Sequence, residues 1–322
     1  MDAELRISEL RQEAACALRP LFDRDFRLLE VPDYPNPGDM LIFQGETEFF
    51  KTLPVRCLEK ATMSSFAARN PKIGKDDLLV FSGGGYFGDL WPRGPKFQKM
   101  VLERYPDNPM VVLPQSVCFR SRESLEEAVA RYGRHRNLSI CLRDRQSFEL
   151  VKKHFANPAY LVPDMAFFAD LSGFEDARPV PVPGKKLLLA RTDKEFADSP
   201  ALKPLESDPE IDKADWPTLE KDIPEFKTMK RLRRHARILG KLADSYARGP
   251  FRKAVVRSAL GLLSPYETVF TTRLHGGIFA ILTGKKAVFA DNSYGKISSL
   301  FDTWLRNCDQ ASMIRGTGGA VT

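Results

Sequence analysis

The sequence predicts an α/β fold built from two units, each with a parallel sheet packed between helices. Three observations lead to this prediction. Short apolar runs alternate with amphipathic stretches, each run ends in a turn rich in Gly, Pro, Asn or Asp, and a proline-rich segment divides the chain. The length of 322 residues suits two domains of roughly 150 residues each. Hydrophobic residues make up 43% of the chain, which is enough to build a buried core.

The first unit is expected to contain five parallel strands with helices between them. Apolar runs of this length are typical of strands that are buried on both faces. The stretches between the runs show the spacing of apolar residues that helices require. The strands are expected at 26–31, 77–82, 109–114, 138–142 and 159–162, and the helices at 40–53, 94–105, 122–132 and 144–155.

Three alternating prolines mark the boundary between the units at 171–185, because such a segment cannot continue a helix. The domains are therefore expected at 1–175 and 186–306, followed by a tail at 307–322. The polar stretch 192–225 predicts no regular element. In the second domain, strands are expected at 186–191, 268–272 and 286–290, and helices at 226–247, 251–263, 274–283 and 296–306. A cleft between two such domains is a common place for a ligand.

Composition argues against several classes of protein. No stretch of about 18 apolar residues is present, so no membrane span is expected. The charged N-terminus lacks the apolar centre of a signal peptide, which predicts a cytoplasmic location. The five cysteines and four histidines are scattered without CxxC or HExxH spacing. They predict neither a disulfide framework nor a metal site.

The net charge of +7 is unevenly distributed, because residues 226–257 hold eleven Lys or Arg and one acid, Asp244. This segment reads as a basic amphipathic helix. Its apolar stripe consists of Phe226, Met229, Leu232, Leu239, Leu242 and Tyr246. Either the stripe faces the core and the cations face solvent, or the helix contacts anionic lipid headgroups or the diphosphate of a lipid-linked acceptor. No nucleic-acid-binding module is recognisable, so nucleic acid is not an expected partner.

Two turns after predicted strands of the first domain are candidate sites. In PNPGDM at 35–40, Asn36 and Gly38 suit positive φ, and Asp39 is placed to cap the following helix. Asp39 could also act chemically. In SGGGYFGD at 82–89, three consecutive glycines let the backbone approach a ligand and present amides to an anion. The turn could equally be structural; its candidate residues are Ser82, Gly83, Gly84 and Gly85.

The most informative turn is TTRLHGG, where Arg273, Leu274 and His275 begin a helix directly after a strand. The positive end of the helix dipole favours an anion there, and Arg273 adds a fixed charge with a bidentate donor fork. His275 can bind an anion or transfer a proton near neutral pH. Arg191 and Arg143 also follow strands. Arg191 is either a site residue or a surface partner of nearby acids, and Asp144 or Ser147 is expected to cap the helix after Arg143.

Taken in order, several motifs resemble the landmarks of the polysaccharide pyruvyl transferases. They are NPGDMLIFQG, FSGGGYFGD, LPQS, LRDRQSFEL, VPDMAFF, TTRLHGGIFAILTGKKAV and NSYGKISSLFDTW, spread over residues 26–306. The resemblance implies two Rossmann-like domains in a GT-B-like architecture, with phosphoenolpyruvate bound in the interdomain cleft and no other cofactor. It also implies that Arg273 and His275 hold the donor, and that Arg191 is the strand-end arginine of the second domain.

The implied reaction forms a pyruvate ketal on a sugar of a surface polysaccharide or a lipid-linked oligosaccharide. Ketal formation needs a general acid and a general base. His275 is the candidate acid or phosphate partner, and Asp39 is the candidate base. Two alternatives stay open: a GT-B glycosyltransferase that uses a nucleotide sugar, and a non-catalytic glycan-binding member of the family. The basic segment makes a peripheral position at the inner face of the membrane a further expectation.

Overall fold

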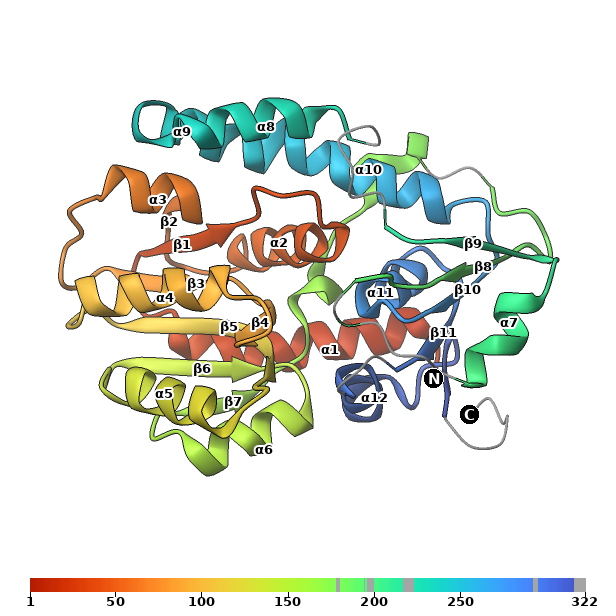
Figure 1. The fold of residues 1–322 in the computed structure, drawn as a ribbon, viewed down its shortest axis with the longest axis horizontal. Helices are drawn as coiled ribbons and strands as arrows, with labels where there is room; N and C mark the ends of the chain where they lie inside the picture. The colour runs from red at the N-terminus through yellow and green to blue at the C-terminus, as the bar shows by residue number, and fades with distance from the viewer. Residues whose placement is uncertain (178–179, 194, 196–199, 217–222, 292–294, 316–322) are drawn as a thin grey trace.

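A computed structural model describes residues 1–177, 180–193, 195, 200–216, 223–291 and 295–315. The described chain forms two parallel sheets with helices packed on their faces (Figure 1). The predicted α/β class with parallel sheets is therefore confirmed. Four segments of the sequence analysis lie partly outside the described residues: the proline-rich linker (178–179), the polar stretch 192–225 (194, 196–199 and 217–222), the last quoted motif (292–294) and the tail (316–322).

The first sheet has the strand order β2-β1-β3-β5-β6-β7, with β4 paired to β5. Its strands are β1 (Phe26–Val31), β2 (Cys57–Thr62), β3 (Leu78–Phe81), β4 (Gly84–Gly88), β5 (Met110–Cys118), β6 (Leu138–Leu142) and β7 (Ala159–Leu161). The helices of this half are α1 (Ala3–Leu18), α2 (Pro37–Phe50), α3 (Met63–Arg69), α4 (Arg93–Arg104), α5 (Arg122–Gly133) and α6 (Arg145–His154). All the strands and helices predicted for the first unit are present, with ends shifted by a few residues.

The second sheet has the order β12-β11-β10-β8-β9. Its strands are β8 (Lys186–Leu189), β9 (Ile211–Ala214), β10 (Thr268–Thr271), β11 (Lys286–Ala290) and β12 (Ala311–Ile314). The helices are α7 (Lys203–Ser207), α8 (Glu225–Arg234), α9 (Ala236–Tyr246), α10 (Arg252–Leu263), α11 (Leu274–Leu282) and α12 (Lys296–Leu300). Single π-helical turns, Ala247–Phe251 and Phe301–Leu305, follow α9 and α12. Short 3₁₀ segments are Arg19–Leu21, Met165–Phe168, Ser172–Ala177 and Pro200–Leu202.

Three predictions about elements are wrong. The stretch 192–225 is not free of regular structure, because it contains α7 and β9. The helix expected at 226–247 is two helices that meet at His235, whose ψ of 26° departs from helical geometry. Residues 307–322 are not simply a tail, since β12 pairs in parallel with β11 at the edge of the second sheet.

Helix α1, which the sequence did not predict, connects the two halves of the molecule. Asp2 caps it by accepting hydrogen bonds from two backbone amides of the first turn. Its side chain at Arg6 donates to the carbonyl of Trp304 (2.9 Å), in the second half. Arg11 donates to the carbonyl of Phe167 (2.7 Å), in the first half. The helix therefore holds both halves in one arrangement.

Helices α8, α9 and α10 follow β8 and β9 in sequence, yet α9 and α10 pack against the first half. Helix α9 contacts α3 and β2, and α10 contacts α2. Figure 1 shows α8 and α9 along the upper edge of the molecule, above α3 and α2. One hydrophobic cluster includes residues from both sheets, such as Leu28 of β1 and Phe289 of β11. The two halves of the molecule are therefore joined by a common hydrophobic core.

Among the described helices, none combines the length and the apolar character that crossing a bilayer requires.

Candidate functional site

A cavity of about 320 Å³ lies where the carboxyl ends of strands from both sheets meet. This is the position at which parallel α/β sheets bind ligands. Its described lining comes from the segments after β1, β6, β8, β9, β10 and β11, with β4, α3 and the start of α4. The lining residues are Tyr34, Asn36, Asp39, Met63, Gly85, Tyr86, Trp91, Arg93, Gly94, Arg143, Arg191, Asp193, Glu195, Trp216, Arg273, Leu274, His275 and Lys296.

The turn after β1 brings Asn36 and Asp39 to the cavity, but its backbone and its helix cap differ from those predicted. Asn36 caps α2, because its side chain accepts from the amide of Gly38 at 3.0 Å. Asp39 lies one turn further on and accepts a hydrogen bond from the hydroxyl of Tyr34 at 2.9 Å. Neither Asn36 nor Gly38 has a positive φ. The prediction that Asp39 is the cap is wrong, because Pro37 starts the helix and leaves Asn36 at the cap position.

The buried position of Asp39 alters its acidity. Burial raises the pKa of its carboxyl above the ordinary value, and the nearby His275, Arg143 and Lys296 oppose that rise. A carboxyl whose pKa lies closer to neutrality suits proton transfer better than a fully solvated one. The candidate base of the sequence analysis therefore lies in a suitable environment.

His275 is the second residue of α11, which begins at Leu274 after Arg273 at the cap position, so it lies at the helix start as predicted. Its Nε2 atom is 3.3 Å from a carboxylate oxygen of Asp164 and 3.4 Å from a guanidinium nitrogen of Arg143. Its Nδ1 faces α2, because a Cβ added at Gly38 would be only 2.6 Å from that atom. The ring is thus held between a carboxylate on one side and a glycine on the other. Orienting a histidine by a carboxylate is a common device for acid–base catalysis.

Arg143 and Asp164 form a buried ion pair beneath His275. The two side chains are 2.8 Å apart and each is 1% exposed. Burial alone would raise the pKa of the Asp164 carboxyl, but the charges of Arg143 and His275 hold it well below its ordinary value. Asp144 caps α6 by accepting from the amide of Ser147 at 2.9 Å, as one of the two predicted alternatives stated. Asp144 also accepts from Ser116, which Arg143 contacts as well.

The glycine-rich turn is divided between the cavity and the interior. Gly85 lines the cavity, and an added Cβ there would be 3.0 Å from the Arg143 guanidinium. Gly84 has φ of 152°, and a side chain there would meet Tyr86. The hydroxyl of Ser82 and the amide of Gly83 both donate to the buried carboxylate of Glu46. Donor binding by Ser82, Gly83 and Gly84 stays a prediction, and of the three glycines only Gly85 is among the described lining residues.

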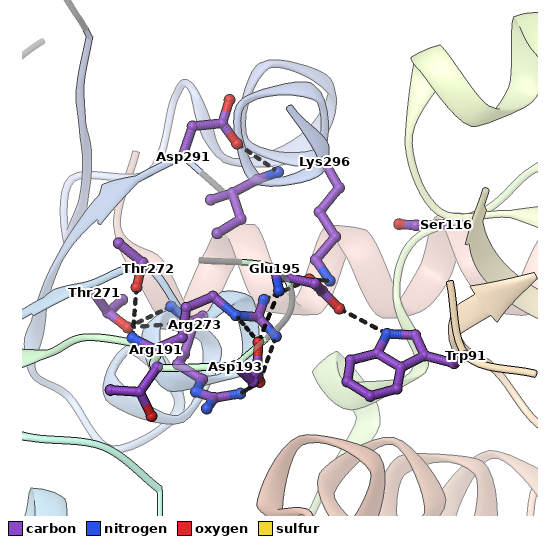
Figure 2. A network of polar contacts seen from close by, with 12 residues as sticks. Trp91, Ser116, Arg191, Asp193, Glu195, Thr271, Thr272, Arg273, Asp291 and Lys296 are labelled. Atoms are coloured by element: carbon purple, nitrogen blue, oxygen red, sulfur yellow. Dashed lines mark hydrogen bonds and ion pairs between the residues drawn. The ribbon is translucent and has the colours of Figure 1, made fainter. Parts of the chain in front are cut away.

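Arg191 and Arg273 follow neighbouring strands and converge on one carboxylate, that of Asp193 (Figure 2). Arg191 binds it through Nε at 2.9 Å and a terminal nitrogen at 3.1 Å. Arg273 binds it through a terminal nitrogen at 2.8 Å and clasps Asp215 with two further bonds of 2.7 Å. Burial would raise the pKa of Asp193, but the bonds from Arg191 and the backbone lower it to about 2. Arg191 is therefore paired with acids, as its alternative interpretation stated, but it is buried in the cavity wall.

Lys296 adds a cation that the sequence analysis did not single out. It is buried and paired with Glu195, which also binds Arg191 and accepts from the indole of Trp91 at 3.0 Å (Figure 2). Burial lowers the pKa of Lys296 to about 8, although the charge of Glu195 opposes this shift. An amine of this kind changes charge close to physiological pH.

Several further site residues were also missed, and the sequence carried signals for only some of them. Asp164 and Lys296 lie within two of the quoted motifs, VPDMAFF and NSYGKISSLFDTW, and both follow strands. Trp91 and Arg93 lie beyond the glycine-rich turn and are brought to the cavity by the start of α4. Nothing in the local pattern indicated that Trp216 reaches the cavity.

The described lining holds five Lys or Arg side chains and three carboxylates. This excess of positive charge, with His275 and the start of α11 beside it, favours a small anionic ligand. In the part of the chain that the structure describes, no group of three or more His, Cys, Asp or Glu is placed to hold a metal ion.

The fold and the lining define an α/β protein with a charged cavity at the carboxyl ends of two parallel sheets. The chain belongs to the polysaccharide pyruvyl transferase family, whose model matches residues 36–294. The resemblance seen in the sequence is thereby confirmed.

Individual relatives agree with this assignment. The Bacillus subtilis protein "Putative pyruvyl transferase EpsO" is 30% identical over 293 residues, covering 89% of this chain and 87% of that protein. "Pyruvyl transferase 1" of Schizosaccharomyces pombe is 28% identical, covering 87% of this chain and 70% of its own. The crystal structure of an uncharacterized Klebsiella pneumoniae protein, KP1_0663, matches with a TM-score of 0.64 over 95% of this chain and 99% of that one. At 19% identity this last likeness supports the fold alone.

Proposed function

We propose that this protein transfers a pyruvyl group from phosphoenolpyruvate to two hydroxyls of a sugar, forming a pyruvate ketal on a polysaccharide or a lipid-linked oligosaccharide. The observation that carries the proposal is the convergence of Arg143, Arg191, Arg273, His275 and Lys296 on one cavity. Family membership supports the reaction class. Two parallel sheets on either side of the cavity support a GT-B-like architecture. The expected cytoplasmic location belongs to the same proposal.

The donor carries a phosphate and a carboxylate, so its site needs several positive groups in fixed positions. Arginine forks suit both groups, because each can bind two oxygens at once. Arg191 and Arg273 now bind the carboxylates of Asp193 and Asp215. These acids hold the two guanidinium groups in place. The oxygens of the donor would either replace the carboxylate oxygens of Asp193 and Asp215 or bind the N–H groups that these acids leave free.

Ketal formation proceeds in two additions at the same carbon of the donor. An acid protonates the methylene carbon, which becomes a methyl group, and the adjacent carbon gains oxocarbenium character. One sugar hydroxyl adds there and loses its proton, phosphate then departs, and the second hydroxyl closes the ring with loss of its own proton. One proton taken up and two released leave one proton for the departing phosphate. We assign proton donation or phosphate contact to His275 and hydroxyl deprotonation to Asp39.

Aromatic residues in the cavity lining suit the acceptor. They are Tyr34, Tyr86, Trp91 and Trp216. Aromatic rings pack on apolar faces while their polar edges accept or donate hydrogen bonds. A sugar placed against Tyr34 would lie beside Asp39, which accepts a hydrogen bond from the Tyr34 hydroxyl.

Ligand-dependent stability tests the proposal. Phosphoenolpyruvate at a hundred times its dissociation constant is expected to stabilise the protein by about 2.7 kcal/mol, because it binds only the folded chain. Thermal unfolding with phosphoenolpyruvate, and with a panel of nucleotide sugars, measures this. Stabilisation by a nucleotide sugar alone would favour the glycosyltransferase alternative.

Turnover provides the second half of the test. Phosphate release from phosphoenolpyruvate is expected only when a sugar acceptor is present, with a product heavier than the acceptor by about 70 Da, as the ketal chemistry requires. Donor binding without release, across a broad set of acceptors, would favour the non-catalytic alternative.

Gly38 packs closely against His275, so a substitution at Gly38 is expected to reduce turnover more than it reduces the stability of the fold. Gly38→Ala is expected to lower turnover roughly 10- to 100-fold, because the new methyl group pushes the ring away from its position. The change favours the helix in other respects, since alanine is the better helix former. Kinetics and thermal unfolding measured together check this.

Gly261→Ala in α10 is the matched control, because an added Cβ there would have no neighbour within 4 Å. It should leave turnover unchanged. Wild-type turnover in the Gly38→Ala protein would contradict the placement of His275 against α2.

A further inference from the structure

Helices α8 and α9 carry an exposed apolar and basic surface that the cavity does not use. The core-facing interpretation of the basic segment holds for Met229 and Leu232, which are buried. It does not hold for Leu242, which is 55% exposed, and the neighbouring Ile238 is 87% exposed. Positions four residues apart lie on the same face of a helix, so Ile238 and Leu242 form one exposed apolar pair.

The residues around this pair are basic. On α9, Arg237, Ile238, Lys241 and Leu242 are all exposed and fall within an arc of about 140°, given 3.6 residues per turn. On α8, Lys227, Arg231 and Arg234 are also all exposed. We call Arg231, Arg234, Arg237, Ile238 and Leu242 the α8–α9 face. Figure 1 shows both helices along the upper edge of the molecule.

The arginines of this face are not used to stabilise the fold. Within the described parts of the chain, Arg231, Arg234 and Arg237 have no hydrogen-bond or ion-pair partner, whereas Lys241 is paired with Glu59. A single exposed isoleucine is ordinary on a protein surface. Two exposed aliphatic side chains beside three arginines without acidic partners are a different feature. The aliphatic side chains can enter the boundary between headgroups and acyl chains, and the arginines can bind anionic headgroups.

We propose that the α8–α9 face docks on the surface of an anionic lipid bilayer, with Ile238 and Leu242 entering the headgroup region and the three arginines binding lipid phosphates. Charge complementarity selects this partner, because the face has three cations and no acid among its members. The apolar pair distinguishes a bilayer from a soluble polyanion, which offers nothing for aliphatic side chains to enter.

The face is fixed to the acceptor side of the cavity. Arg233 of α8 lies 3.8 Å from Asp33, which also binds Arg93 of the cavity wall at 2.7 Å. On α9, the buried Asp244 accepts from the amide of Thr62 and the hydroxyl of Ser65, each at 2.8 Å. Thr62 and Ser65 lie on either side of Met63 in the sequence, and Met63 is another lining residue. If the proposed function holds, docking therefore brings the acceptor side of the cavity to sugars carried at the membrane surface.

Vesicle sedimentation tests the docking. The full-length protein is expected to sediment with phosphatidylcholine vesicles that contain phosphatidylglycerol, and to stay in the supernatant with phosphatidylcholine alone. Replacing Arg231, Arg234 and Arg237 with glutamine should weaken binding about 100-fold. Each cation near an anionic surface strengthens binding roughly fivefold, and three such contributions multiply. Ile238→Ser with Leu242→Ser should weaken it about tenfold or more, because both side chains leave the headgroup region.

Matched controls come from other surfaces. One control protein loses three exposed cations outside the face, by Arg134→Gln, Arg136→Gln and Lys153→Gln. The first two residues follow the end of α5, and the third lies in α6. In Figure 1, α5 and α6 lie at the edge of the molecule opposite α8 and α9. Leu5→Ser with Val182→Ser removes two exposed aliphatic side chains outside the face. Both control proteins should bind vesicles as the unaltered protein does.

Three outcomes would overturn the proposal. These are no sedimentation with anionic vesicles, equal loss in the control proteins, and loss in the arginine variant but not in the Ile238 and Leu242 variant. The last result, together with equally tight binding to inorganic polyphosphate, would identify a general polyanion surface. Phosphate release with a short soluble acceptor should be unchanged in all four proteins. Vesicle sedimentation therefore tests the docking, and phosphate release independently tests the proposed reaction.

Discussion

His275→Gln is expected to lower turnover roughly 100- to 10,000-fold, which is the range that a positioned acid or base contributes. The Nε2 atom of His275 lies 3.3 Å from Asp164, and the side chain lines the cavity with Arg143. Glutamine keeps a hydrogen-bonding side chain at the start of α11 but cannot transfer a proton. Steady-state phosphate release and donor affinity, measured on the same protein, show the size and the origin of the loss.

The two candidate roles of His275 make different predictions for these measurements. If His275 donates the proton, kcat falls and the dissociation constant of phosphoenolpyruvate changes little. If it binds the phosphate, the dissociation constant rises as well. His154→Gln is the control, because His154 is exposed at the end of α6 and should have no effect. Near wild-type turnover in both His275→Ala and Asp39→Ala would show that neither residue has the assigned role.

The strands that the sequence predicted correctly are mostly those with neighbours on both sides. β1, β3, β5, β6, β10 and β11 are interior strands whose sequences are mostly apolar. The strands that it missed include β2, β9 and β12, which are edges of their sheets. An edge strand is partly exposed, so its sequence contains polar residues, as CLEKAT of β2 does. Apolar runs therefore indicate the centre of a parallel sheet more clearly than its borders.

The same physical reasoning explains what was predicted of the site. Parallel strands end at one edge of a sheet, so residues after strands, such as Arg191, Arg273 and His275, could be placed near one another. Their partners could not, because the contact between His275 and Asp164 spans 111 residues and depends on how the two sheets are packed. Lys296 looked like one more basic residue at a helix start. Its significance comes from burial against Glu195, which only the tertiary structure shows.

Arg143→Met is expected to reduce the free energy of unfolding by about 3–5 kcal/mol, because it leaves the carboxylate of Asp164 buried without its partner. Urea unfolding at neutral pH measures the loss. Arg257→Met provides the control, since Arg257 and Asp176 form an exposed pair worth roughly 0–1 kcal/mol. An equally small effect of Arg143→Met would contradict a buried ion pair beneath His275.

The pH dependence of this loss has a defined sign. In the unaltered protein the pKa of Asp164 lies below its unfolded value, so the stability it contributes is present above that value and is lost on acidification. In Arg143→Met, burial without the arginine raises the folded pKa above the unfolded value, so the charged form carries a penalty that protonation removes. The difference in stability between the two proteins should therefore shrink as the pH falls from about 7 towards 4.

The double variant Arg143→Met, Asp164→Asn separates the structural role of the pair from its role in the cavity. Asparagine keeps a side-chain oxygen for the amide of Ala166, which Asp164 now accepts at 2.8 Å, and it removes the unpaired charge. Much of the lost stability should therefore return. Turnover should not return, because the guanidinium beside His275 and the carboxylate that orients its ring are both missing. Recovery of turnover along with stability would show that the pair serves the fold alone. The positive charge of the cavity would then come from Arg93, Arg191, Arg273 and Lys296.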